Sequence, residues 1–242
     1  MRSPPNVWTG PISTPGASVG TRNIVRPRCG RSWRLVRVSV KTYCARCAVV
    51  VSGANLTLDA AVIARLWAPL WAARVMLLQN EIPEPINLAA AVAARQRGAR
   101  IILNAAPARA MPPALLNLVD ILIVNRVEAR MLSGCEDMDA ALRQLGAADR
   151  DLILTRGGAG LSIVSRDGRR TDMAAHPVKL LSSHGAGDCF CGALAARIAS
   201  GDDIVAAVNF ARVAAALLVS CTEDERASLS AETVRAEMGM AQ

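Results

Sequence analysis

Residues 181–194 have the sequence LSSHGAGDCFCGAL, which predicts a turn that runs directly into a helix. Gly185, Ala186 and Gly187 carry almost no side chain, so the first N–H groups of this helix stay open to approach. Because these groups lie at the positive end of the helix dipole, they form an anion hole suited to a phosphate. Asp188 follows beside this anion hole, where a carboxylate can serve by removing a proton or by binding a metal ion.

Length and composition limit the class of protein. A chain of 242 residues is long enough for one sizeable domain, and 52% of its residues are hydrophobic. No apolar run of roughly 20 residues lacks a charge, so we expect no membrane span. The seven cysteines form no recognisable framework, and there is no secretory signal. This combination predicts reduced thiols in a cytoplasmic protein.

The first part of the chain, residues 1–47, differs from the rest. Residues 1–48 hold nine Lys or Arg and no Asp or Glu, whereas residues 48–242 are close to neutral. A transit peptide, a basic arm for nucleic acid or anionic lipid, and an extension without an evolved fold all fit this segment. We favour the last, and we expect no nucleic-acid partner for the domain at 48–242. Cys44 and Cys47 lack a second pair at zinc spacing, so we expect no metal site there.

From residue 48 onward, short apolar runs alternate with helical patterns. The runs predict strands at 48–55, 74–83, 100–108, 121–125 and 151–165, the last with a glycine turn and a return strand. Helices are expected at 56–70, 84–99, 114–120, 126–134, 137–147, after Gly187, and at about 204–220. Continuous apolar strands that alternate with helices are typical of a parallel sheet covered on both faces.

Polar and small residues fall where these strands end. They are Gly53 to Asn55, Gln79 to Glu81, Asn104, Asn125 to Glu128, and Thr155 to Gly158. In an open parallel sheet, ligands bind beyond the carboxyl ends of the strands. We therefore expect the functional site along this edge.

Three short motifs are candidates for the chemistry, and each has a purely structural alternative. HGAGD at 184–188 is also compatible with close helix packing, NRVE at 125–128 with a capping box, and TRGGAG at 155–160 with a hairpin turn. Their occurrence in this one order, followed by a buried Ala-rich helix, is more specific than any of them alone.

In this order the motifs make residues 48–220 similar to the PfkB family of carbohydrate kinases, and most similar to its ribokinases. The stretches that carry the resemblance are QNEIP (79–83), NAAPAR (104–109), LVDILIVNRVEARMLSG (118–134), TRGGAG (155–160) and HGAGDCFCGALAARIASG (184–201). The resemblance implies a Rossmann-like α/β fold with a small β lid. It also implies transfer of the ATP γ-phosphoryl group to a sugar hydroxyl with Mg²⁺ and often a monovalent cation.

Site residues follow from the resemblance position by position. Asp188 matches the catalytic base, and Gly185, Ala186 and Gly187 match the anion hole. The other matched positions are Asn125 and Glu128, which act on phosphates and on Mg²⁺ largely through water, Thr155 and Gly157 along the nucleotide phosphates, Asn209 at the adenine pocket, and Glu81 at the sugar.

The sequence also departs from the family. Residues 1–48 lack the glycine-rich sugar-binding segment and the Asp of the first strand, so we expect the first strands and the lid to be missing or replaced. Ser182 and Ser183 stand where the family usually has Asp-Thr, which leaves activation by a monovalent cation open. The unmatched lid leaves homodimer formation open as well.

Three hypotheses remain. The first is a ribokinase-like kinase that converts D-ribose to ribose 5-phosphate. The second is a truncated, catalytically impaired remnant that retains nucleotide binding. The third is a PfkB kinase for another sugar or a nucleoside.

Overall fold

The computed structural model describes residues 20–21, 39–40, 53–57, 59–61, 72–146 and 149–240. The chain divides into two units, Met1–Val51 and Ser52–Gln242. In the first unit, β1 (Gly20–Thr21) and β2 (Ser39–Val40) pair antiparallel. The CxxC pair and most of the strand expected at 48–55 lie outside the described residues, as does most of the helix expected at 56–70. The residues Gly53–Thr57 form a short 3-10 helix, η1, where a turn and the start of a helix were expected.

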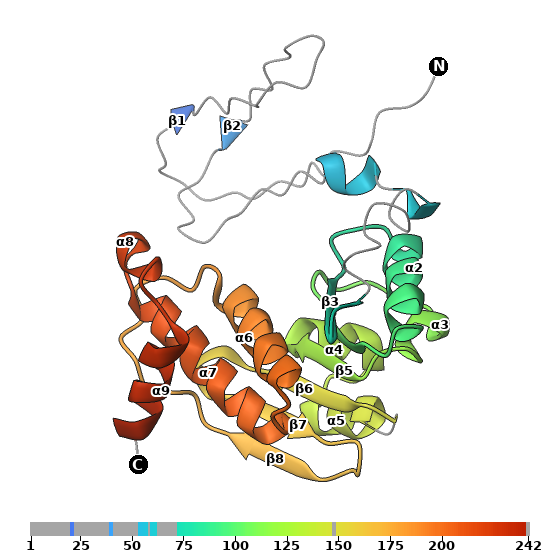
Figure 1. Ribbon diagram of the computed structural model, residues 1–242. Helices are drawn as coiled ribbons and strands as arrows, with labels where there is room; N and C mark the ends of the chain where they lie inside the picture. Colours follow the sequence, from blue (N-terminus) through green and yellow to red (C-terminus); the bar gives the residue numbers. More distant parts are fainter. Residues whose placement is uncertain are drawn as a thin grey trace. The chain divides into compact units, whose positions relative to one another are not determined.

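The second unit is an α/β domain built on one six-stranded sheet (Figure 1). Its strands are β3 (Val75–Gln79), β4 (Arg100–Asn104), β5 (Ile121–Asn125), β6 (Asp151–Thr155), β7 (Leu161–Val164) and β8 (Arg170–Met173). Its helices are α2 (Glu84–Arg95), α3 (Pro113–Leu116), α4 (Arg126–Ser133), α5 (Met138–Gly146), α6 (Ala186–Ser200), α7 (Ile204–Ser220), α8 (Glu223–Arg226) and α9 (Ala231–Met240), with a 3-10 turn, η3 (Gly157–Ala159).

The strands follow one another in the order β3-β4-β5-β6-β7-β8. The first four are parallel, and β7 and β8 are antiparallel to their neighbours. The expected parallel sheet with a return strand is therefore confirmed. The strand β8 and the helices α8 and α9 were not expected from the sequence.

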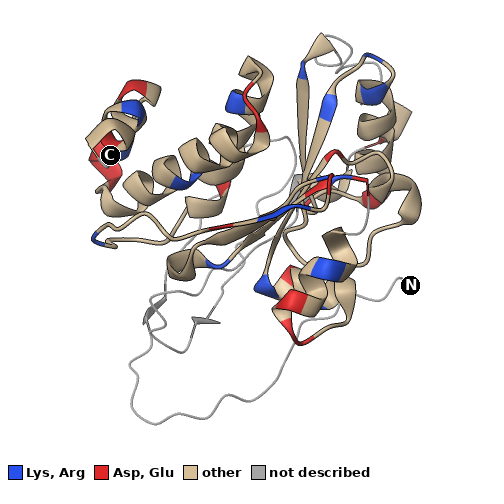
Figure 2. Cartoon of the chain, turned by 90° about the horizontal axis from the view of Figure 1, so that it is seen from below, with Lys and Arg blue, Asp and Glu red and all other residues tan. Residues whose placement is uncertain are grey.

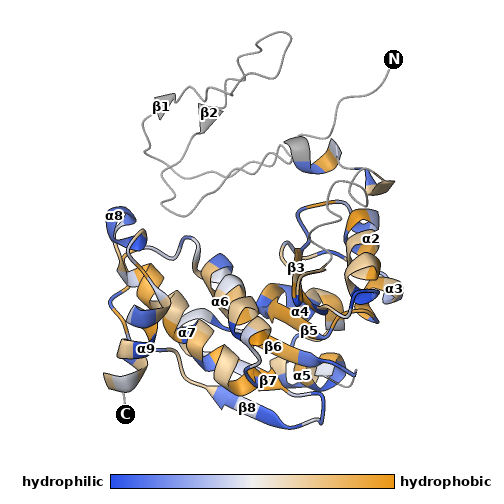
Figure 3. Ribbon diagram, in the orientation of Figure 1, coloured by the Kyte–Doolittle hydropathy of each residue, from blue (hydrophilic) through white to orange (hydrophobic). Residues whose placement is uncertain are grey.

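Helices cover both faces of this sheet. Leu103, Leu122 and Leu154 point to the face covered by α2, α3, α4 and α5. Their strand neighbours Ile102 and Ile153 point to the opposite face, where α6 and α7 lie. Because both faces are buried, the strands are apolar throughout, which explains why they lack an alternating pattern. Figure 3 shows the contrast with β8 and α8, which are largely hydrophilic.

Most charged residues lie on the outside of these layers, and Glu128 and Asp151 are buried exceptions. In the view of Figure 2, basic and acidic residues are interspersed over the helices and loops of the described part, without a broad area of one sign. Many of them pair with each other, such as Arg197 with Asp202 at 2.6 Å and Arg170 with Asp139 at 2.7 Å.

Gly160 ends the turn between β6 and β7, and it has a conformation that favours glycine, with φ of 84°. A Cβ at this position would lie 2.1 Å from the carbonyl oxygen of Met173. We therefore expect Gly160→Ala to lower the free energy of unfolding by at least about 2 kcal/mol, through backbone strain and displacement of β8. The measurement is chemical denaturation of the full chain.

Gly158 in the same turn supplies the control. It has no positive φ, and a Cβ there would meet no heavy atom within 4 Å. Gly158→Ala is expected to leave the denaturation midpoint nearly unchanged. Equal effects of the two substitutions would contradict the close approach of β8 to the turn.

Candidate active site

The N-terminus of α6 has open backbone donors. Gly185 is its N-cap, with a left-handed backbone (φ of 79°) and no side-chain cap. The first helical hydrogen bond runs from Cys189 N to Gly185 O at 2.9 Å. Within the part of the chain that the structure describes, no group accepts from the N–H of Gly187 or Asp188. This end of the helix therefore offers two free donors at the positive end of its dipole.

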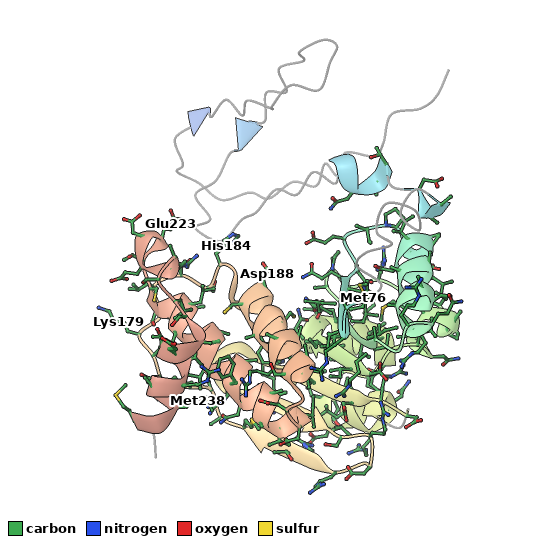
Figure 4. The ribbon with its side chains drawn as sticks, in the orientation of Figure 1. Met76, Lys179, His184, Asp188, Glu223 and Met238 are labelled. Carbon is green, nitrogen blue, oxygen red and sulfur yellow. The ribbon has the colours of Figure 1, made fainter. Side chains whose placement is uncertain are left out.

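Asp188 lies in the same first turn of α6, and its side chain is exposed (Figure 4). Its Oδ1 accepts a hydrogen bond from Gln79 Nε2 at 3.4 Å. Gln79 is the last residue of β3, so the contact joins the end of the sheet to the start of the helix. Sequence reasoning placed Gln79 at a strand end but did not assign it to the site.

The ends of the four parallel strands lie on one edge, as expected. Gln79 and Asn104 are register partners at the ends of β3 and β4, and Asn125 and Thr155 are partners at the ends of β5 and β6. Thr155 Oγ1 donates to the carbonyl oxygen of Val124 at 3.4 Å. The polar residues at the four strand ends thus form one row.

Gly157 begins the turn after β6, with φ of 57°. A Cβ at Gly157 would have no heavy atom within 4 Å. Space is therefore open beside this glycine, and its backbone is accessible to a ligand.

Asn125 and Glu128 form the capping box that was the structural alternative for NRVE. Asn125 Oδ1 accepts from the N–H groups of Val127 at 2.8 Å and Glu128 at 3.1 Å. In return, the Glu128 carboxylate accepts from Asn125 N at 2.6 Å and from Asn125 Nδ2 at 2.7 Å. Glu128 is buried, and this burial raises its pKa, while the two hydrogen bonds from Asn125 lower it in part.

This arrangement predicts a pH-dependent effect of Asn125→Ala. Loss of the cap is expected to cost about 1–2 kcal/mol of folding free energy. Alanine keeps the backbone N–H of this position but lacks the Nδ2 donor, so the buried carboxylate of Glu128 would have a still higher pKa. The loss of folding free energy in Asn125→Ala should therefore be smallest at a pH where Glu128 is protonated in both the wild type and the variant. It should grow as the pH rises above 4.5, the ordinary pKa of a glutamate. Chemical denaturation between pH 4 and 8 measures this.

The exposed capping box of Thr222 and Glu225 supplies the control. Hydrogen bonds from Thr222 lower the pKa of Glu225. The stability that this pair contributes is present above the ordinary pKa and is lost as the pH falls below it. The effect of Thr222→Ala should therefore vary only below about pH 4.5. If the effect of Asn125→Ala does not vary with pH above 4.5, burial does not raise the pKa of Glu128.

Cys191 lies on α6, three residues after Asp188. Its thiol is buried on α6, and burial raises its pKa to about 12, with smaller contributions from the negative charges of Asp188 and Glu128. The Cys191 thiol therefore stays protonated at neutral pH.

Glu81 lies in the turn after β3 and is exposed. The turn is anchored to the segment after β4: Asn80 N donates to Ala106 O at 2.8 Å, and Arg109 Nη1 donates to Ile82 O at 2.8 Å. Burial lowers the pKa of Arg109, which the charge of Glu84 offsets in part. These bonds fix the backbone that presents Glu81.

Asn209 lies away from the start of α6. The last turn of α7 holds Leu218, which a Cβ on Gly185 would meet at 3.4 Å. Asn209 is in the N-terminal half of α7, roughly 13 Å away along the helix axis. Its side chain accepts from Arg212 Nη2 at 2.6 Å. The predicted role of Asn209 at an adenine pocket therefore requires a ligand that extends along α7.

The described residues contain neither a cluster of metal ligands nor a helix that could cross a membrane. No three His, Cys, Asp or Glu side chains among them gather in a way that could hold a metal ion. None of the helices described has the length and apolar character needed to span a bilayer.

Comparisons with known proteins bear on this site. The family model for pfkB family carbohydrate kinases matches residues 46–231. The ribokinase of Haemophilus influenzae is 31% identical over 179 residues, which cover 71% of this chain and 58% of that protein. The ribokinase of Staphylococcus aureus is 30% identical over 177 residues, which cover 70% of this chain and 58% of that protein.

A solved structure shows the same fold. The structure of Arabidopsis thaliana ribokinase complexed with ribose and ATP has a TM-score of 0.67 and 22% identity, over 84% of this chain and 64% of that one. The matched part of this chain spans 58% of the length of each of the two bacterial ribokinases above. The match to the family model and the identity to these relatives lead to one conclusion: the chain belongs to the PfkB family of carbohydrate kinases.

Proposed function

We propose that this chain transfers the γ-phosphoryl group of ATP to a hydroxyl group of a sugar, with D-ribose as the leading substrate. The observation that carries the proposal is the first turn of α6, where the free N–H groups of Gly187 and Asp188 and the exposed carboxylate of Asp188 occur together. The N–H groups would stabilise charge on the transferred group, and the carboxylate would take the proton of the attacking hydroxyl.

The other predicted residues would serve the two substrates. Asn125, Thr155 and Gly157 would line the nucleotide phosphates, since they lie at the ends of β5 and β6 and in the open turn beyond. Asn209 would lie beside the adenine end of the nucleotide. Glu81, exposed on its anchored turn, would contact the sugar. Positioning of this kind supplies much of the rate enhancement in phosphoryl transfer.

The environment of the Glu128 carboxylate is compatible with a contact to Mg²⁺ through water. Both of its oxygens already accept from Asn125, and its buried charge would be stabilised by a cation nearby. Mg²⁺ usually keeps several waters and takes few carboxylates, which suits a site with a single buried carboxylate. When bound, the cation neutralises phosphate charge.

A second function has an observation in its favour. Because the chain spans 58% of the length of the two relatives, a nucleotide-binding remnant without turnover is the alternative. A PfkB kinase that acts on another sugar or a nucleoside is a variant of the first proposal. A coupled assay with ATP, Mg²⁺ and a panel of sugars and nucleosides separates these three, and turnover with none of them would contradict the proposed kinase.

ATP binding has its own test. At an ATP concentration about 100 times the Kd, the native chain should gain about 2.7 kcal/mol, which corresponds to a rise in Tm of roughly 5–10 °C. Thermal denaturation with Mg²⁺, with and without ATP, measures this shift. AMP, which lacks the phosphates that reach the start of α6, is the control and should give a much smaller rise. Equal shifts with both nucleotides would contradict a phosphate site at α6.

A further inference from the structure

The side chain of Gln79 lies on the face of β3 that α6 covers. Successive side chains of a strand point to opposite faces. Val75 and Leu77 pack with α6 and α7, whereas Met76 and Leu78 pack with α2. Gln79 continues the row of Val75 and Leu77, so its side chain points toward α6 at the carboxyl end of the strand.

The backbone of Gln79 is held on both sides. Its carbonyl oxygen accepts from Asn87 Nδ2 at 2.7 Å, and Asn87 is fully buried on α2. On the neighbouring strand, Asn104 is its register partner. A side chain that starts from such a fixed backbone can direct the group that it contacts.

The group that Gln79 contacts is Asp188. Its Nε2 lies 3.4 Å from Asp188 Oδ1, and no other described residue donates a hydrogen bond to this carboxylate or forms an ion pair with it. A neutral amide orients a carboxylate without the strong charge neutralisation of an arginine or a lysine, so the carboxylate remains free to act as a base.

We propose that Gln79 is a positioning residue for Asp188 in the phosphoryl transfer proposed above, on which this inference rests. Its amide holds Oδ1 and leaves Oδ2 free to take the proton of the substrate hydroxyl. As that proton moves to Oδ2, the hydroxyl oxygen forms a bond to the γ-phosphorus of ATP. The bond from this phosphorus to the oxygen that bridges it to the β-phosphate breaks, and ADP leaves.

The kinetic test uses Gln79→Glu, which keeps the shape of the side chain but replaces the donor with a negative charge. We expect kcat to fall roughly 10- to 100-fold while the KM for the sugar changes less than about threefold, because the base is misplaced and the pocket is not. Gln96→Glu, the same change at an exposed position after α2, is the matched control and should leave both constants unchanged. A rise in KM with unchanged kcat would overturn the inference, since Gln79 would then bind the sugar. Unchanged constants would overturn it as well.

A second test does not depend on turnover. In the full chain, Gln79→Glu places two carboxylates side by side and should lower the Tm by about 2 °C at pH 8. Adding Asp188→Asn restores an amide–carboxylate pair with the roles exchanged, and it should return most of this loss. No recovery would show that the two side chains do not interact, which overturns the inference.

The two tests also distinguish this inference from the proposed function. If the wild-type chain phosphorylates no sugar, the kinase proposal and the positioning role fail together, even where the Tm recovers. If the wild-type chain turns over and Gln79→Glu has the same kcat, only the positioning role fails.

Discussion

Asp188→Asn is expected to lower kcat by about 10²- to 10⁴-fold, because a carboxamide cannot take the proton of the attacking hydroxyl. The substitution keeps the size of the side chain, and Asn Oδ1 can still accept from Gln79. Asp188 is exposed, so the Tm should stay within about 2 °C of wild type. Steady-state kinetics with the best sugar of the panel, together with thermal denaturation, measures both effects.

Asp149→Asn is the matched control for this substitution. Asp149 precedes β6, at the opposite end of that strand from Thr155, and its side chain is 91% exposed beside Arg166. Such a surface pair contributes little to stability, and no substrate contact is predicted there. A loss of kcat at Asp149 equal to that at Asp188 would show a general electrostatic effect and not the loss of a base.

Gly187→Ala is expected to lower turnover by about 10²- to 10³-fold, as much as the loss of one anion-hole donor costs, because the added methyl group would keep the phosphoryl group away from the N–H group that alanine retains. A Cβ at this position meets no heavy atom within 4 Å, so the added methyl group would extend into open space beside a free N–H group. The methyl group would then occupy space needed by the phosphoryl group. Kinetics at saturating ATP measures the loss, and the Tm rise with ATP should shrink in parallel.

Gly192→Ala controls for the helix itself. Gly192 lies on α6, where a Cβ also meets no heavy atom within 4 Å. Alanine inside a helix is more stable than glycine by about 0.5–1 kcal/mol, so both variants should keep or raise the Tm. Normal activity in Gly192→Ala beside a loss in Gly187→Ala places the effect at the anion hole. Normal activity in both would contradict the role of Gly187.

Apart from β8, the order of strands and helices from β3 to α7 could be predicted, because each of the other strands is a continuous apolar run. The helix ends were visible too: Gly98 and Gly134 follow α2 and α4 with positive φ. In contrast, β8 was missed because its sequence, RTDM, has no apolar run, and only Met173 packs against the core. Its charged side chains instead pair with residues far along the chain, which no local pattern reveals.

The sequence indicated part of the geometry of the candidate site. Asn125 and Glu128 form the capping box that was the structural alternative for NRVE. The same hydrogen bonds would fix the Glu128 carboxylate for the water-mediated contact to Mg²⁺ that the family resemblance implies. The contact between Gln79 and Asp188 could not be predicted from spacing, since it joins residues 109 positions apart. Only the alternation along β3 and the placement of α6 over its end bring them together.

The most direct test of the central claim is to incubate the full wild-type chain with ATP, Mg²⁺ and D-ribose and to detect sugar phosphate by mass spectrometry, with Asp188→Asn in parallel. Phosphoryl transfer by Asp188 predicts ribose phosphate from the wild-type chain and about 10²-fold less or none from the variant. No sugar phosphate from a wild-type chain whose Tm rises with ATP would contradict it and would indicate a chain that binds nucleotide without transferring its phosphate.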